Sequence, residues 1–196
     1  MYACTNGQGE ITNSLSLKDS LQLELSRLHD TLLVSGYYVK YILDDSNRVY
    51  THWGNQDFDR SYFYDYGIED IHEYFKIEYK DYIGLHSWSG HFWRIKFLPK
   101  NNSDSIITFD YPICYDAKND LIFWKEQLAE NEYTISWVGG MENKRITLDS
   151  FPEFGFFMDG IDSVHFVDNG LFVRWKTELD FSENAKMKEQ LFVIEF

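Results

Sequence analysis

The feature that most constrains the fold of this chain is a rhythm of short apolar runs and turns that begins near Tyr37. From there to the end, runs rich in β-branched and aromatic residues are separated by turn-forming residues at intervals of about 8 to 12 residues. Phe, Tyr and Trp make up 18% of the chain, a composition that favours strands over helices. The pattern predicts a largely antiparallel sheet built as a meander, and a sandwich or a curled sheet would both satisfy it.

Two segments depart from this rhythm and are predicted to be helices. Residues 16–36 carry leucines at helical spacing, with Ser16 and Asp19 arranged almost as a capping box and Gly36 as a natural stop. This predicts an N-terminal amphipathic helix whose apolar stripe comprises Leu17, Leu21, Leu25, Leu28 and Leu32. A second, short helix is predicted over residues 67–76, which carry an apolar stripe of Ile68, Ile71 and Phe75. The predicted fold class is therefore α+β, mainly β.

A chain of 196 residues is long enough for one domain with a substantial core and short for two. Residues 1–14 are polar and lack periodicity, and they are predicted to form a flexible lead. Residues 15–196 are predicted to form one globular domain.

The formal net charge of −14 argues against nucleic acid as a ligand, because phosphate binding requires clusters of Lys and Arg. The charge favours a basic partner instead. The alternative is that the acidic residues only solvate the surface and keep the protein soluble.

The densest mixture of acidic and aromatic residues lies between Asp57 and Glu73. Carboxylates can steer a basic protein toward its site, while aromatic side chains supply anchors. The predicted partner-binding residues are Asp57, Asp59, Tyr62, Tyr64, Asp65, Tyr66, Glu69, Asp70 and Glu73. The alternative is an irregular crossing between hairpins with a solvated face.

A second candidate site is the stretch GLHSWSGHFWRIKF, residues 84–97. With Ser89-Gly90 as the hairpin loop, Trp88 opposes His91 and His86 opposes Trp93, which places all four side chains on one face. Such a face could stack a sugar or an aromatic group. The favoured interpretation is a core face with the histidines at its wet edge, and a metal site would need further ligands that the spacing does not supply.

The strongest single turn signal is Asn169-Gly170, which predicts a two-residue type I′ hairpin. In that register Phe166 opposes Val173 and His165 opposes Arg174. One face of the hairpin is then almost purely apolar, and His165 lies on the surface.

Three segments share an order of apolar residue, Asp, turn, apolar strand and Trp: residues 43–53, 115–125 and 167–176. The Asp can bond its own turn backbone, and the Trp can cap a core layer. Because the Asp-to-Trp spacing varies, recurrent hairpin chemistry explains the similarity better than divergent repeats.

Recognisable catalytic and cofactor motifs are missing from the sequence. His72-Glu73 begins an HExxH pattern, but Lys76 stands where the second histidine is required. No GxSxG, Gly-rich phosphate loop or CxxC occurs, so neither a cofactor nor a metal is predicted. An enzyme that uses histidines or paired carboxylates without a local signature stays an alternative, including a hydrolase.

The two cysteines, Cys4 and Cys114, are too few for a disulfide framework. Cys4 follows a small residue and precedes a polar run, as in a lipoprotein processing site, whereas Cys114 suits a small buried hydrophobe. No run approaches the roughly 20 apolar residues of a membrane span. A cytoplasmic location is slightly favoured over a lipid-anchored one at the cell envelope.

Taken together, these features favour a non-enzymatic, acidic protein-binding module. The function predicted is that of an inhibitor or immunity-type protein that neutralises a basic partner such as a toxin. The alternative is a cell-envelope lipoprotein that binds a glycan or small ligand on the Trp-rich face.

Overall fold

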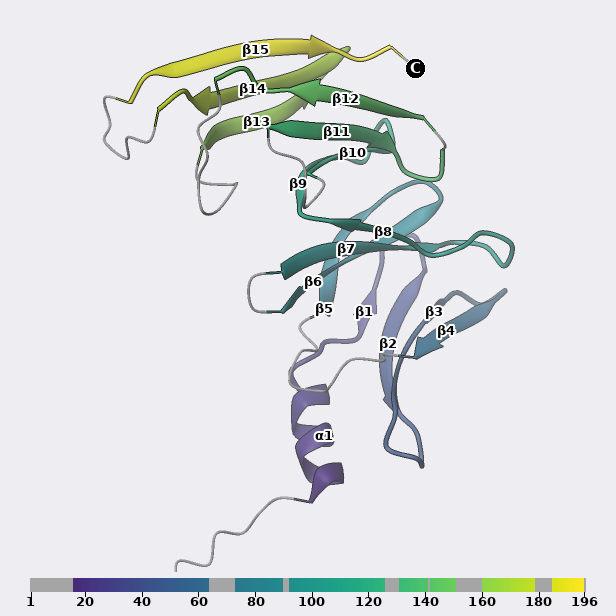
Figure 1. Ribbon diagram of the computed structural model, residues 1–196. Helices are drawn as coiled ribbons and strands as arrows, with labels where there is room; N and C mark the ends of the chain where they lie inside the picture. Colours follow the sequence, from purple (N-terminus) through teal and green to yellow (C-terminus); the bar gives the residue numbers. More distant parts are fainter. Residues whose placement is uncertain are drawn as a thin grey trace, which may run out of the picture.

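The protein is mainly β, with four antiparallel sheets and little helix. Figure 1 shows the sheets following one another from the first at the bottom to the last at the top, in the order of the chain. The computed structural model describes residues 16–63, 73–89, 92–125, 131–140, 142–150, 160–178 and 185–195. The predicted flexible lead, residues 1–14, lies outside these residues.

Each sheet is a meander of consecutive strands, as the rhythm of apolar runs predicted. Sheet A contains β1 (Thr31–Leu32), β2 (Tyr38–Leu43), β3 (Val49–Gly54) and β4 (Asp59–Phe63). Sheet B contains β5 (Glu73–Glu78), β6 (Tyr82–Ser89), β7 (Phe92–Pro99) and β8 (Ile107–Asp110). Sheet C contains β9 (Pro112–Asp116), β10 (Leu121–Trp124), β11 (Glu132–Trp137) and β12 (Asn143–Thr147). Sheet D contains β13 (Ile161–Val167), β14 (Gly170–Lys176) and β15 (Met187–Val193).

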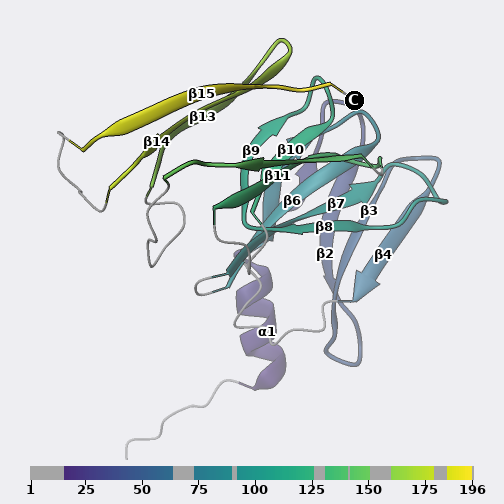
Figure 2. The same cartoon turned by 45° about the horizontal axis from the view of Figure 1, so that its top comes forward.

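Apolar layers between successive sheets hold the stack together. Between A and B the layer includes Val39, Trp53, Ile83, Leu85 and Leu98. Between B and C it includes Tyr79, Tyr82, Ile95, Phe97, Ile122 and Val138. Between C and D it includes Phe123, Tyr133, Ile135, Leu171, Val173 and Trp175. Sheets B and C are therefore covered on both faces, whereas A and D each turn one face away from the stack, as Figure 2 shows from a second direction.

A buried polar cluster interrupts the apolar layer between A and B. The carboxylate of Glu73, fully shielded from solvent, accepts hydrogen bonds from Lys96 Nζ at 2.7 Å and from Tyr62 Oη at 2.7 Å. Thr51 Oγ1 donates a further bond at 3.2 Å. Burial raises the pKa of the Tyr62 hydroxyl well above its usual value, and the Glu73 charge adds to this effect. An ion pair in such a position must be complete, because a lone buried charge is costly.

The N-terminal helix is shorter than the sequence predicted. Helix α1 spans Leu17–Leu25, and the Ser16 hydroxyl accepts a bond from the Asp19 amide at 3.2 Å, as a capping residue does. The chain then leaves the helix, and Leu32 lies exposed in β1. An amphipathic helix that extends to Gly36 is therefore not confirmed.

The second predicted helix is also not confirmed. Residues 73–76 of that segment form the start of β5, and residues 67–72 lie outside the described part of the chain. Phe75 fits a helical stripe and a strand equally well, and pairing with β6 decides between them. Tertiary pairing overrides such short-range periodicity.

Both predicted hairpin registers are wrong by two residues. In D, Val167 opposes Gly170, so the loop is Asp168-Asn169 instead of Asn169-Gly170. Gly170 is needed inside the strand, because a Cβ there would lie 2.6 Å from the Phe192 carbonyl oxygen. A shift of two residues preserves the faces, so the apolar face and the exposed position of His165 are as predicted.

The β6–β7 hairpin shows the same shift. Ser89 opposes Phe92, and Trp88 opposes Trp93 instead of His91. Trp88, Trp93 and His86 still share a face, because the shift is even. His91 lies outside the described residues.

Candidate functional site

Alternate connections of the four meanders meet at one end of the stack. In a meander every second turn lies at the same end of the strands. The first and third connections of A, B and C therefore lie at one end, as does the first connection of D. At this end lie the connections β1–β2, β3–β4, β5–β6, β7–β8, β9–β10, β11–β12 and β13–β14. We call these seven connections, with the residues that flank them, the acidic turn end.

Hydrogen bonds join the turns of A to those of B. Ser35, between β1 and β2, bonds the Glu78 carboxylate at the end of β5. Arg60, at the start of β4, donates to the carbonyl oxygens of Asn101 and Asp104, each at 2.8 Å. Four connections of the two sheets are thus joined in two pairs, β1–β2 with β5–β6 and β3–β4 with β7–β8.

The turns of B are joined to those of C in the same way. The Lys80 amide of B donates to Asp120 Oδ1 of C at 3.3 Å. Within C, the Val138 amide donates to the Asp120 carbonyl at 2.8 Å and joins the β11–β12 connection to the β9–β10 connection. Gly139, at a positive φ of 88°, lies so close to the Tyr82 ring that a Cβ would be 2.7 Å from it. The turns therefore form one continuous, ordered surface across the sheets.

Carboxylates dominate this surface. The acidic residues of the seven connections are Asp57, Asp59, Glu78, Asp81, Asp104, Asp116, Asp120, Glu142 and Asp168. Their described basic residues are Arg60, Lys80, Lys100 and Lys118. Nine carboxylates against four basic groups leave a net charge of minus five at this end, out of −14 for the chain.

The ionisation of these groups reflects how closely they are packed. Burial raises the pKa of Asp120, and the neighbouring charges of Asp81 and Asp116 raise it further. Burial opposes ionisation of Glu78 too, but bonds from Lys100 and Ser35 outweigh it and lower the Glu78 pKa. Asp120 thus lies among other carboxylates, whereas the charge of Glu78 is balanced by Lys100.

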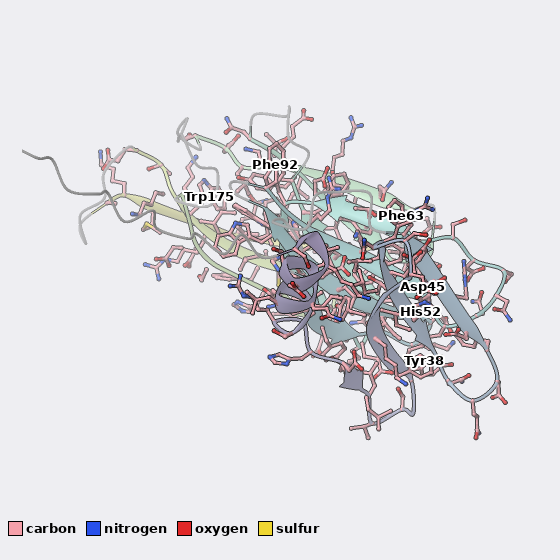
Figure 3. The ribbon with its side chains drawn as sticks, turned by 90° about the horizontal axis from the view of Figure 1, so that it is seen from below. Tyr38, Asp45, His52, Phe63, Phe92 and Trp175 are labelled. Carbon is pink, nitrogen blue, oxygen red and sulfur yellow. The ribbon has the colours of Figure 1, made fainter. Side chains whose placement is uncertain are left out.

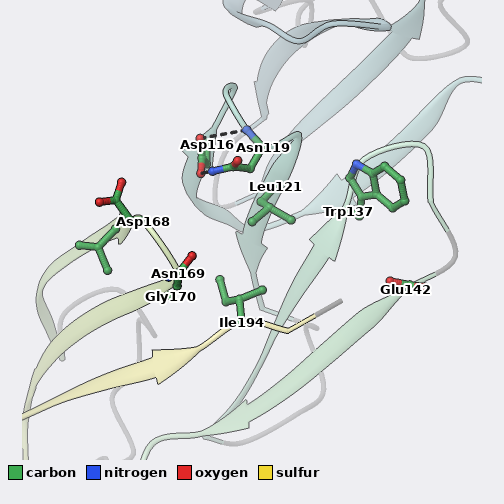
Figure 4. Close-up of a pocket in the computed structure, with 10 residues that line it drawn as sticks. Asp116, Asn119, Leu121, Trp137, Glu142, Asp168, Asn169, Gly170 and Ile194 are labelled. Carbon is green, nitrogen blue, oxygen red and sulfur yellow. Dashed lines mark hydrogen bonds between the residues drawn. The ribbon is translucent and has the colours of Figure 1, made fainter.

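A pocket of about 440 Å³ opens within the acidic turn end, between the turns of C and D. Figure 4 shows its walls: the β9–β10 turn faces the β13–β14 turn, and the end of β11 closes a further side. Its polar lining comprises Asp116, Asn119, Glu142, Asp168 and Asn169. Its apolar lining comprises Leu121, Trp137, Val167, Gly170 and Ile194.

The carboxylates of the pocket differ in the hydrogen bonds and ion pairs that they make. Asp116 accepts bonds from the Lys118 and Asn119 amides at 3.0 and 3.3 Å, and so holds its own turn. Asp168 and Glu142 make no ion pair with any cation in the described part of the chain. These two carboxylates are available to a ligand.

Trp137 gives the pocket an aromatic wall. Its side chain is 45% exposed, and the backbone of Gly140 packs against the ring so closely that a Cβ there would be 2.6 Å from it. Figure 4 shows Trp137 and Asp168 on opposite sides of the pocket, so a basic side chain there meets an aromatic ring at one side and a carboxylate at the other, through cation–π and ionic contacts.

The predicted partner-binding cluster is divided by the fold. Asp57 and Asp59 belong to the β3–β4 connection and are exposed at the acidic turn end. Asp59 accepts a bond from Tyr38 Oη at 2.7 Å and lies 3.5 Å from His52 Nδ1. Glu73 is buried and Tyr62 half-buried between A and B. Tyr64, Asp65, Tyr66, Glu69 and Asp70 lie outside the described residues.

The predicted Trp-rich site is assembled in part. Trp88 is 56% exposed beside the half-buried Trp93, and His86 Nδ1 lies 2.7 Å from the Tyr74 hydroxyl. Burial lowers the pKa of His86, and Lys76 contributes to the shift. This face lies by the β6–β7 turn, at the opposite end of B from the acidic turn end.

The remaining expectations concern cysteines, metals and membranes. Cys4 lies outside the described residues, whereas Cys114 is half-buried in β9, where burial raises its pKa. Among the described residues, no group of three or more His, Cys, Asp or Glu side chains is placed to hold a metal ion. Within the same ranges, no helix is long and apolar enough to cross a membrane.

Sequence reasoning missed the pocket residues Trp137, Glu142 and Asp168. It attributed Asp116 and Asp168 to turn formation, and Asp116 has that role. The usable signal was spacing within each sheet, because alternate connections of one meander lie at the same end.

The chain matches no family model, no curated protein and no solved structure. Functional inference therefore depends on the geometry of this surface.

Proposed function

We propose that this protein is a non-enzymatic binding module that neutralises a basic protein partner, as an inhibitor or immunity-type protein does. The observation that carries the proposal is the net charge of minus five on a single end of the stack. A surface of one sign raises the rate of encounter with a partner of opposite sign and selects against acidic partners.

The pocket provides a place for one basic side chain of that partner. A Lys or Arg side chain could lay its hydrocarbon stem on Leu121 and bring its charge to either Asp168 or Glu142, which line opposite sides of the pocket. A basic group removed from solvent in this way acts as an anchor, while the surrounding carboxylates provide steering. A toxin whose active site is cationic would be blocked by such contacts.

The proposal is tested with a capped hexalysine peptide as the probe, titrated by calorimetry over a range of salt concentrations. We expect the wild-type protein to bind it with an affinity that falls as salt rises. A triple variant of the acidic turn end, Asp81→Asn, Glu142→Gln and Asp168→Asn, should bind roughly ten-fold or more weakly at low salt, with a shallower salt dependence.

A matched control removes three carboxylates elsewhere: Asp45→Asn, Glu132→Gln and Asp149→Asn, all exposed. Both triple variants have the same net charge. If both lose affinity equally, the peptide senses net charge alone and the proposed site is wrong. Capture from cell lysate with the wild-type protein, and its loss with the first variant, would then identify the natural partner.

A second candidate function rests on the exposure of Trp88 next to Trp93 and His86. This face would suit a glycan or another small ligand at the cell envelope, because sugars stack on exposed indole rings. Quenching of tryptophan fluorescence by soluble oligosaccharides, lost in Trp88→Ala, would support this function. Absence of quenching across a broad panel would exclude it for those sugars.

A further inference from the structure

The face of D that turns away from the stack is apolar at the end next to the pocket. Along β14, Leu171, Val173 and Trp175 are buried against C, so the residues between them point the other way. Phe172 is one of these. The same alternation applies to β13 and β15, which flank it.

Two cross-strand rows make up this apolar area. His165, Phe172 and Leu191 form one row across the three strands. Val167, Gly170 and Val193 form the next, nearer to the turn. Leu191 and Val193, on the edge strand β15, are 53% and 51% exposed and lie side by side on this face. We call these six residues the outer apolar rows.

The outer apolar rows are continuous with the pocket. Val167 and Gly170 line the pocket and also form part of the second row. Leu191 lies directly over Gly170, where a Cβ would come within 2.9 Å of its Cδ1 atom. The area therefore begins at the rim that carries Asp168.

The charged residues on the two sides of the outer apolar rows differ. The rows are bounded on one side by Asp168 and Glu142 of the pocket, and on the other by the polar row that contains Arg174 and Glu189. Arg174 is already paired with Asp162, at 3.5 Å. The polar row thus carries charges of both signs, whereas Asp168 and Glu142 at the pocket side make no ion pair among the described residues. A ligand that fits this surface is basic at the pocket end and apolar beyond it.

We infer that the partner's binding surface continues from the pocket onto the outer apolar rows of D, so that the partner presents apolar side chains next to the basic one. This inference rests on the proposed function. The occupant is the basic partner and not a second copy, whose own Asp168 and Glu142 would add negative charge beside the same rows. Figure 3 shows Trp175 of D far from Tyr38 and His52 of A, so this surface is separate from the outer face of A.

The test uses two capped peptides of equal charge, one alternating Lys with Gly and one alternating Lys with Leu. The wild-type protein should bind the Lys–Leu peptide about ten-fold more tightly than the Lys–Gly peptide. In the double variant Leu191→Ser and Val193→Ser this ratio should fall to about one, while the salt dependence stays unchanged. Both positions are half exposed, so the variant should fold.

Variants of the pocket should behave in the opposite way. With Asp168→Asn and Glu142→Gln, both peptides should bind more weakly and with less salt dependence, while the Leu-to-Gly ratio is kept. Ile42→Ser is the matched control, because Ile42 is 44% exposed on the outer face of A. It should leave both the affinities and the ratio unchanged.

The outcomes separate the two proposals. If the ratio survives Leu191→Ser and Val193→Ser, or falls equally in Ile42→Ser, this inference is overturned while the proposed function stands. If neither peptide responds to the pocket variants, the proposed function fails as well. A wild-type dimer in light scattering that dissociates in the Leu191/Val193 variant would assign the rows to a second copy and also overturn the inference.

Discussion

The sharpest test of the stacked architecture is the substitution Glu73→Gln in the layer between A and B. The Glu73 side chain is fully shielded from solvent, and that of Lys96, 2.7 Å away, is only 14% exposed. The substitution keeps the shape and one acceptor oxygen, but it replaces the other oxygen with an amide donor and removes the negative charge 2.7 Å from the Lys96 ammonium group. Solvent cannot easily replace the lost partner, because A covers this face of B.

The expected cost follows from the burial of both partners. Breaking a buried ion pair by removing one charge typically costs about 3–5 kcal/mol. The amide oxygen of Gln can still accept a bond from Tyr62 or Lys96, so we expect the lower part of this range, about 3 kcal/mol. That is a large share of the total stability of a domain, about 5–15 kcal/mol.

The measurement is urea denaturation at neutral pH, with the slope checked for constancy. The exposed pair Arg174–Asp162 provides the control, and Asp162→Asn should cost less than about 1 kcal/mol. Adding Lys96→Met to Glu73→Gln should recover part of the loss, because no ammonium group is then buried beside the neutral Gln amide. If Glu73→Gln alone stays within about 1 kcal/mol of the wild type, the sheets do not enclose this pair as the structure indicates.

Two further predictions concern the charge and the core. Asp120→Asn should raise stability at pH 7, because burial and the charge of Asp81 raise the Asp120 pKa above its ordinary 3.8. A carboxyl group whose pKa is raised by folding destabilises the protein only where it is ionised, that is, at a pH above its ordinary pKa. The higher urea midpoint of Asp120→Asn should therefore vanish below about pH 3.8. A higher midpoint that persists there would contradict the electrostatic cause. Trp175→Ala should lower the free energy of unfolding in urea by about 3–5 kcal/mol, because Trp175 is 1% exposed and its Nε1 donates to a backbone carbonyl at 3.0 Å. Trp88→Ala, at an exposed position, should change that free energy by less than about 1 kcal/mol. Equal costs for the two would refute the assignment of Trp175 to the core.

Much of the fold could be predicted because alternation along a strand is a local property. The apolar face of the β13–β14 hairpin and the shared face of Trp88 and Trp93 follow from period-two patterns, which survive an error of two residues in the turn. The loop positions could not be predicted from turn propensity alone. Gly170 resembles a turn residue, but its role is to let the strand backbone approach Phe192.

The division into four stacked sheets depends on contacts between residues far apart in sequence. Phe75 and its neighbours have a helical apolar spacing, and only pairing with β6 makes them a strand. For the same reason Glu73 was expected on the surface, whereas the structure buries it against Lys96.

The net negative charge of the protein could be predicted from composition, but the position of the acidic surface could not. Asp57 and Asp59 were predicted in a continuous segment, whereas the structure places them among turns from all four sheets. The pocket residues Trp137 and Asp168 come together only through the stacking of C on D. Counting the strands of each sheet predicts which turns share an end of that sheet, but the stacking of the sheets is needed to bring the site together.

The most direct test of the central claim is a map of amide chemical shifts while the hexalysine peptide is titrated into the isotope-labelled protein. The account predicts that the shifts concentrate in the β5–β6, β9–β10 and β13–β14 turns and in the Trp137 indole N–H, and that salt reverses them. Shifts concentrated instead at the β2–β3 turn, at the opposite end of the stack, or spread evenly over the surface, would contradict it.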